Sequence, residues 1–194
     1  GPDDKPGLRD FAAEPPPLRP ARDHTRMRAT SALLSCDARG ASHAAPAPCR
    51  CRMPPIHHRL AISTTHPIEI VDLTERLRSW VRGSGIRDGL LTVMSPHTTA
   101  RITINERETE LQRDMVRFLE RLAPADADYG HNRAPVDDRL NAHSHLIGLF
   151  MNASESIPVA DGELVMGGWQ SLFFIELDGP RERREVHLHL MRAE

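Results

Sequence analysis

A histidine followed by two threonines is the stretch of this chain best suited to chemistry. His97, Thr98 and Thr99 come directly after Ser95-Pro96, which separates an apolar run from a second run of alternating apolar and polar residues. Because proline cannot donate to a strand ladder and disfavours helix at the residue before it, the stretch predicts a corner between two strands. Such a corner would present an imidazole and two hydroxyls together. A polar hairpin that only terminates its strands is the alternative interpretation.

A second group of candidate residues lies between residues 129 and 146. Tyr129 and His131 occupy a loop rich in Asp, Pro and Gly, and loops of this kind often carry function. Asn141 and His145 are four residues apart and would share one face of a helix, whereas His143 would point elsewhere. In an extended segment His143 and His145 would instead form a metal clip. The apolar residues favour the helix because they recur at its spacing, at Ala142, Leu146, Leu149 and Phe150.

Hydrophobic periodicity predicts the elements that must position these residues, in the order ββαββααβββ. Helices are expected to begin at Asp72 and at Asn105, because each is followed three residues later by a Glu, as in a capping box. The second helix would end at Pro124 and carry Asp114 at the edge of its apolar stripe. Strands are predicted over 59–65, 66–71, 87–95, 99–105, 156–159, 169–177 and 185–191.

Two of the predicted C-terminal strands have distinctive faces. Residues 169–177 are apolar on both faces, so this strand must be covered on both sides by a sheet, a helix or another subunit. In the last strand, His187 and His189 alternate with apolar residues and share one face. Two histidines on one strand face can hold a metal, but the favoured interpretation is the solvated side of an edge strand.

The N-terminal quarter differs in composition from the rest. Residues 1–53 contain eight of the 16 prolines and all three cysteines, and they show no sustained periodicity. Such a segment cannot bury enough apolar surface to offset its chain entropy. We expect a disordered tail or a non-native extension translated upstream of Met53, with a transit peptide as a further option. Residues 54–194 are expected to form a single domain.

Charge and cysteine usage exclude several classes of protein. The net charge is −2, and residues 1–53 and 54–194 carry about +3 and −5 by count of charged side chains, which does not suggest nucleic-acid binding. No uninterrupted apolar stretch is long enough for a signal peptide or membrane span. The predicted domain lacks cysteine and needs no disulfide, so a reducing, cytoplasmic compartment is expected.

Several separated polar motifs, taken together, resemble the YjbQ family. The resemblance covers roughly residues 56–192 and implies an α+β fold, a two-sheet β-sandwich with flanking helices, assembled as a homotrimer. The motifs that carry it are His97-Thr98-Thr99-Ala100, Ile104-Asn105-Glu106, Tyr129-Gly130-His131-Asn132, Asn141-Ala142-His143-Ser144-His145-Leu146, Ile157-Pro158-Val159, Gly168-Trp169-Gln170 and Asp178-Gly179-Pro180-Arg181.

The resemblance further implies a secondary thiamine-phosphate synthase. This enzyme would join hydroxymethylpyrimidine diphosphate to a thiazole phosphate and release pyrophosphate, whose charge requires a divalent cation or cationic donors. Imidazoles are the candidate cation ligands or phosphate donors, at His97, His131 and His145. Candidate substrate contacts are Thr98, Thr99, Asn105, Asn141, Gln170 and Arg181. Candidate carboxylates for Mg²⁺ or acid–base work are Glu106 and Asp114.

Two alternatives to the synthase remain open from sequence. Imidazoles suit Zn²⁺ better than Mg²⁺, so three histidines with an open fourth position could instead make a zinc-dependent hydrolase. The third possibility is a non-catalytic trimeric module that binds a small phosphorylated metabolite. Each alternative uses the same histidines for different chemistry.

Overall fold

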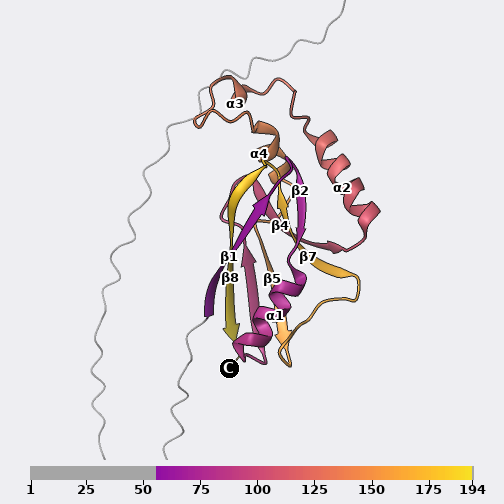
Figure 1. Ribbon diagram of the computed structural model, residues 1–194, viewed down its shortest axis with the longest axis vertical. Coiled ribbons are helices and arrows are strands. Elements are labelled where there is room, and N and C mark those ends of the chain that lie inside the picture. The colour runs from indigo at the N-terminus through magenta and orange to yellow at the C-terminus, as the bar shows by residue number, and fades with distance from the viewer. Residues whose placement is uncertain (1–55, 194) are drawn as a thin grey trace, which may run out of the picture. The chain divides into compact units, whose positions relative to one another are not determined.

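The computed structural model describes residues 56–193, which fold into two antiparallel sheets with helices at their ends and along one side (Figure 1). The expectations for residues 1–53 lie outside the described residues. The elements are β1 (Ile56–Thr64), β2 (Glu69–Asp72), α1 (Thr74–Ser84), β3 (Gly89–Met94), β4 (Ala100–Glu106), α2 (Thr109–Leu122), α3 (Gly130–Arg133), α4 (Ala142–Gly148), β5 (Ser154–Ala160), β6 (Glu163–Leu164), β7 (Gln170–Glu176) and β8 (Arg181–Arg192).

The predicted order of elements is confirmed, with two short additions. The four-residue α3 interrupts the stretch predicted as a loop, and the two-residue β6 pairs with the end of β5. Neither is long enough to produce a periodic hydrophobic signal, which explains why the sequence pattern did not predict them. No helix within residues 56–193 is long and apolar enough to cross a bilayer.

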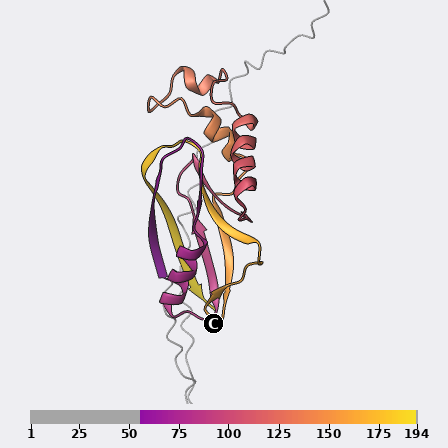
Figure 2. The same ribbon diagram turned by 45° about the vertical axis from the view of Figure 1, so that its right-hand side comes forward.

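The two sheets contain five and three strands. The larger sheet has the order β1-β8-β3-β5-β6 and the smaller one β2-β7-β4. Figure 2 shows the two layers side by side, with α2 along the outer side of the smaller sheet. The prediction of an edge strand at residues 185–191 is wrong, because β8 lies between β1 and β3. Its histidines therefore stand on an interior strand of the larger sheet.

Strand β7 is buried on both faces, and a single chain provides both covers. Leu172 and Phe174 are fully buried in the main core between the sheets. Phe173 and Ile175 pack on the other face with Leu119 of α2 and other apolar residues of a second cluster. The expected cover is thus supplied within one chain, by the core between the sheets on one face and by the cluster that includes α2 on the other, and the strand's two apolar faces do not by themselves require a second subunit.

Helix α1 begins where the sequence places it, with a small difference in its cap. Leu73 is the N-cap residue, while Asp72, one position earlier, accepts a hydrogen bond from the Thr74 amide at 2.8 Å. The fully buried Leu77 and Val81 dock the helix onto the main core. Gly85 ends it with a φ of 71°, a conformation that favours glycine.

Helix α2 begins later than predicted. Asn105 belongs to β4, where it pairs with Ser171 of β7, and so it cannot cap the helix. Glu108 caps instead, accepting hydrogen bonds from the amides of Glu110 and Leu111 at 2.8 and 2.7 Å. Within the expected apolar stripe Leu119 is buried, but Phe118 is 56% exposed. Part of this stripe thus faces away from the chain's own core.

Candidate functional site

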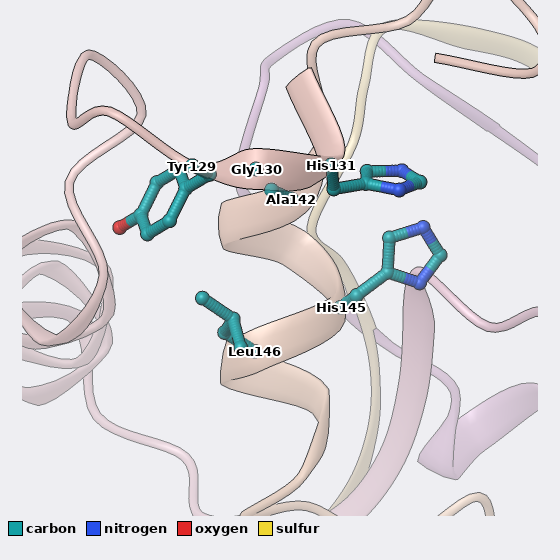
Figure 3. A pocket seen from close by; sticks show the side chains of 6 residues that line it. All are labelled: Tyr129, Gly130, His131, Ala142, His145 and Leu146. Atoms are coloured by element: carbon teal, nitrogen blue, oxygen red, sulfur yellow. The ribbon is translucent and has the colours of Figure 1, made fainter. Parts of the chain in front are cut away.

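The candidate site is an open hollow of about 480 Å³ beside α4. Its lining consists of six residues from the α3 turn and from α4, namely Tyr129, Gly130, His131, Ala142, His145 and Leu146. Figure 3 shows the imidazoles of His131 and His145 on the same side of α4, with Tyr129 and Leu146 on the other side. The two imidazole rings meet edge to face, with their centroids 5.2 Å apart. Two of the three predicted histidines are therefore brought together.

A chain of hydrogen bonds fixes the orientation of His131. Asn141 donates from Nδ2 to Oδ2 of Asp178 at 3.0 Å, and its Oδ1 lies 3.2 Å from Nε2 of His131. Because a carboxylate can only accept, the Asn141 amide must turn its NH₂ group toward Asp178. Its oxygen then requires a donor, so Nε2 of His131 carries the hydrogen. The other ring nitrogen, Nδ1, is left to act on a ligand.

Asp178 is the buried anchor of this chain, with only 7% of its side chain exposed. Arg139 binds it through two nitrogens, with Nη2 2.7 Å from Oδ1 and Nε 3.1 Å from Oδ2, and Arg181 binds it as well. Burial alone would raise the pKa of Asp178. The hydrogen bonds from Arg139, Asn141 and Arg181 outweigh that effect and hold the pKa below its usual value. The carboxylate is thus a fixed negative charge behind the hollow.

Helix α4 is fastened so that Asn141 and His145 both face His131. Its first amide, at Ala142, donates to Oδ1 of Asn132 at 3.1 Å, and Ser144 donates its hydroxyl to the Leu177 carbonyl at the end of β7. The helical interpretation of residues 141–150 is confirmed, and the extended metal clip of His143 and His145 is not formed. Burial lowers the pKa of His143, the negative charge of Asp178 opposes that effect, and the nearby His145 adds a smaller lowering.

His97 lies in a different environment. Its Nε2 accepts a hydrogen bond from the Glu185 amide of β8 at 3.0 Å, so this nitrogen is occupied by the protein itself. Burial and then the positive charge of Arg184 lower its pKa, despite the opposing effect of Glu176. The neighbouring Thr99 is buried and accepts from Arg184 at 3.0 Å. These two residues thus support the junction of strands, while Thr98 is exposed beside them.

Arg101 connects the histidine corner to α4. Its Nη1 donates to the His97 carbonyl at 3.0 Å, and its Nε donates to the Gly148 carbonyl at 3.1 Å. A Cβ at Gly148 would come within 2.6 Å of the Arg101 guanidinium, so glycine is required for this close approach. The corner and the hollow are therefore coupled through one side chain.

The other predicted site residues are not brought to the hollow. Asn105 and Glu106 are exposed at the end of β4, and Asp114 forms an exposed ion pair with Arg117 on α2. Gln170 lines a separate hollow of about 260 Å³ with Trp169 and other residues, and its Oε1 accepts from the Gly167 amide. Only Arg181, Asn141 and the two histidines join the site around Asp178.

A resident metal ion is not supported by the donors of one chain. Within residues 56–193, no group of three His, Cys, Asp or Glu side chains could hold a metal ion. A catalytic zinc uses three protein ligands, and the hollow offers only His131 and His145. The predicted set of three histidines is incomplete because His97 is hydrogen-bonded to β8 instead. We therefore assign no step below to a metal.

The sequence did not single out Asp178 and Arg139 as site residues. In the sequence, Asp178 belongs to the turn motif Asp178-Gly179-Pro180-Arg181, and Arg139 lies in a stretch without periodicity. A usable signal was present, since an aspartate directly after a doubly buried strand must find a partner for its charge. That reasoning would have pointed to Arg139 or Arg181 as the partner.

The sequence of this chain matches a known protein family. Residues 58–193 match the sequence model of the family described as UPF0047 protein YjbQ-like. A UPF0047 protein from Methanothermobacter thermautotrophicus is 44% identical over 125 residues, which span 64% of this chain and 85% of the relative. The UPF0047 protein YugU of Bacillus subtilis is 33% identical over 125 residues, which span 64% of this chain and 91% of YugU.

Solved structures of relatives share the fold. A YbjQ-like protein of unknown function from Sulfolobus solfataricus has a TM-score of 0.67 at 34% identity, covering 72% of this chain and 99% of that one. A YjbQ/UPF0047 protein from Clostridium acetobutylicum has a TM-score of 0.63 at 33% identity, covering 69% and 99%. The sequence match spans nearly all of the described fold. The chain belongs to the UPF0047 protein YjbQ-like family.

Proposed function

We propose that the hollow at His131 and His145 binds a small phosphorylated metabolite and that the chain is a secondary thiamine-phosphate synthase. The observation that carries the proposal is the pair of imidazoles facing one hollow, one of them oriented through Asn141 by a buried carboxylate. Preorganised donors of this kind are what a reaction that expels a charged leaving group requires. The resemblance of the polar motifs to the YjbQ family supports the choice of substrates.

The proposed reaction assigns work to the chain's own residues. The thiazole nitrogen attacks the methylene carbon of hydroxymethylpyrimidine diphosphate, and the carbon–oxygen bond breaks with its electron pair leaving on pyrophosphate. His145 would donate an imidazole N–H to the phosphate oxygens as their charge grows. His131 would donate through Nδ1 only as an imidazolium, because its Nε2–H is already bound to Asn141. A hollow of about 480 Å³ falls within the range of small-molecule sites. Mg²⁺ would enter with the diphosphate as part of the substrate.

The hydrolase alternative receives less support than the synthase. A zinc hydrolase needs three ligands around one ion, and in one chain His97 is held away from that role by the Glu185 amide. A binding module that holds the metabolite without turnover uses the same hollow. The assay below separates it from the synthase.

We further propose that three copies assemble around the exposed apolar surface near the hollow. The exposed apolar side chains that would meet in this assembly lie on α2, on α4 and on the segments that flank α4, at Phe118, Leu140, Leu146, Leu149 and Phe150. Leu149 and Phe150 are each 76% exposed, and monomers rarely leave extensive apolar patches open to water. Because the reaction uses charged, phosphorylated precursors that do not cross membranes unaided, we place it in the cytoplasm.

The test is formation of thiamine phosphate from its two precursors by the purified full chain with Mg²⁺. Replacing His145→Ala or Asn141→Ala should lower the rate by at least about tenfold, because each removes a donor or its positioning group. His143→Ala is the matched control from the same helix, and it should retain most of the activity. Circular dichroism would verify that each variant folds.

Three outcomes would contradict parts of this proposal. Equal losses in all three variants would contradict the assignment of Asn141 and His145 to one helix face. No product above background in the unmodified chain would refute the synthase. Thermal stabilisation by thiazole phosphate without turnover would indicate the binding module instead.

A further inference from the structure

Three histidines gather on the solvent side of the larger sheet, away from the hollow. His57 lies on β1, while His187 and His189 lie on β8, the adjacent strand (Figure 1). His57 is directly opposite His189, and His187 is two pairs further along the ladder, opposite Arg59. The alternate residues of β8 point into the core and are buried, at Val186, Leu188 and Leu190. The histidines therefore share the face of this strand pair that points away from the core.

Two of these imidazoles already have the spacing of metal ligands. Nε2 of His57 lies 3.3 Å from Nδ1 of His187, and the ring centroids are 5.2 Å apart. Two nitrogens bound at about 2.0–2.1 Å to one tetrahedral Zn²⁺ are about 3.3 Å apart. The observed separation is at the long end for a nitrogen–nitrogen hydrogen bond. The ring of His189 is further off, with its centroid 6.5 Å from that of His57.

A carboxylate stands behind His187, on the side opposite His57. Oε2 of Glu185 lies 3.9 Å from Nε2 of His187, while Oε1 accepts from Arg183 at 3.1 Å. Histidine ligands usually donate their second ring N–H to a carboxylate, which fixes the tautomer and makes the other nitrogen a better ligand. At 3.9 Å, Oε2 of Glu185 and Nε2 of His187 are not hydrogen-bonded as they stand, and a small rotation of the Glu185 side chain would be needed to join them. With its hydrogen then held on Nε2, His187 would present the lone pair of Nδ1 toward His57.

We propose that His57 and His187 form an accessory site for a first-row transition-metal ion such as Zn²⁺, on the outer face of β1 and β8. Imidazole nitrogen suits zinc, nickel and copper, whereas Mg²⁺ prefers oxygen. Two protein ligands with water in the remaining positions make an exchangeable site. Residues 56–193 contain no group of three His, Cys, Asp or Glu side chains that could hold a metal ion, so the proposed site is limited to two protein ligands.

The site differs from the histidine pair in the hollow. At the hollow, Nε2 of His131 is hydrogen-bonded to Asn141, and the two rings meet edge to face. On the sheet, the two nitrogens themselves face each other. An ion there would also link β1, the edge strand of the larger sheet, to β8 across 130 positions of sequence. Binding should therefore stabilise the docking of β1.

The test is calorimetric titration of Zn²⁺ into the full chain, with Cys36, Cys49 and Cys51 replaced by Ser so that thiols do not bind the ion. Adding His131→Ala and His145→Ala removes the pair in the hollow. This parent should bind one Zn²⁺ per chain, and its unfolding temperature should rise with zinc but not with Mg²⁺. His57→Ala or His187→Ala should weaken binding by at least tenfold.

The matched control is His58→Ala, on the same strand but on the opposite face, where its ring stacks on Trp80. It should leave zinc affinity within about twofold of the parent, and circular dichroism would verify folding of each variant. Absence of saturable binding by the parent at millimolar zinc would overturn the proposal. Unchanged affinity in a His57→Ala, His187→Ala double variant would overturn it too, by placing the ion elsewhere.

Discussion

At the scale of single residues, Asp178 explains more of the site than any histidine does. It is almost fully buried, yet two arginines and Asn141 keep it charged. Removing one member of such a buried network leaves an uncompensated charge or an unpaired donor, which costs several kcal/mol in comparable cases. Its effect on chemistry is indirect. Through Asn141 it decides which nitrogen of His131 carries the hydrogen, so Asp178 and Asn141 are positioning residues.

Asn141→Ala should release the tautomer of His131. In the unmodified chain the ¹⁵N chemical shifts of the His131 ring should report hydrogen on Nε2, because the Asn141 oxygen accepts from it. In the variant both neutral tautomers should be populated. Asn152→Ala, which removes an exposed amide bound to Glu155, is the control and should leave His131 unchanged. An unaltered Nε2 tautomer in Asn141→Ala would show that the hydrogen-bonded chain does not set it.

His97 should make stability depend on pH. Burial and Arg184 lower its pKa in the folded state below the usual 6.5, so below that pH the unfolded chain binds more protons than the folded one. The stabilising effect of neutral His97 is fully present above pH 6.5 and is lost as the pH falls through its folded-state pKa. Urea unfolding between pH 5 and 7.5 should show a smaller loss of stability in His97→Gln. Parallel curves for the two proteins would contradict this.

At the scale of elements, the site depends on how α4 meets β4 and β7. Ser144 ties α4 to the end of β7, and Arg101 of β4 reaches both the Gly148 carbonyl and the His97 carbonyl. These bonds hold the helix that carries Asn141 and His145. The positions of the site residues therefore depend on strand–helix junctions, which are less mobile than a free loop.

Gly148→Ala should loosen this junction. The new Cβ would lie 2.6 Å from Arg101, whose guanidinium would have to give up its carbonyl contacts, at a cost of about 1–3 kcal/mol in unfolding free energy. Gly83→Ala is the matched control in α1. Nothing lies within 4 Å of a Cβ there, so the change should stabilise the protein by about 0.5–1 kcal/mol. Both stabilities would be measured by urea unfolding. Similar effects of the two substitutions would contradict the claim that the contact between Arg101 and Gly148 holds α4 in place.

Sequence patterns predicted the elements well where one chemical signal dominated. The spacing of Asn141 and His145 gave the correct helix face, and the apolar run before Glu176 gave a strand buried on both sides. The start of α2 was predicted too early, since Asn105 has the chemistry of a cap but is committed to the β4–β7 ladder. Whether a residue such as Asn105 caps a helix or joins a strand is decided by long-range strand pairing, and a local sequence pattern carries no information about that pairing.

Long-range contacts also explain which site residues the sequence could predict and which it could not. Of the three selected histidines, the structure brings His131 and His145 together, whereas His97 was grouped with them because its nearby hydroxyls suggest a site. Only the fold shows that the amide of Glu185, 88 positions later, occupies its Nε2. Asp178 was missed because its importance arises from two arginines and an amide that converge on it in space.

At the scale of the whole molecule, the exposed apolar surface around the hollow is the main unexplained feature of a single chain. Phe150 and Leu149 stand at the end of α4, close to the residues that line the hollow. Covering them with other copies of the chain would remove apolar area from water and enclose the hollow further. The trimer is thus part of the functional proposal.

Phe150→Asp should weaken this assembly, because it would bury a charge in the proposed interface. Light scattering on the unmodified chain should give three times the 21.7 kDa chain mass, and the variant should shift toward the mass of one chain. Val165→Asp is the control, at an exposed apolar residue that follows β6 and does not belong to the apolar surface around the hollow. It should preserve the trimer. A monomeric mass for the unmodified chain would refute the assembly.

The most direct test of the central claim is to watch the imidazoles while the ligand binds. Two-dimensional ¹H–¹⁵N spectra of the full chain would be recorded with increasing thiazole phosphate and then pyrophosphate. We expect His131 and His145 to shift together and saturably, and His57 and His187 on the sheet to stay unchanged. Saturable shifts confined to the indole of Trp169, which lines the other hollow, would contradict the claim and move the binding site there.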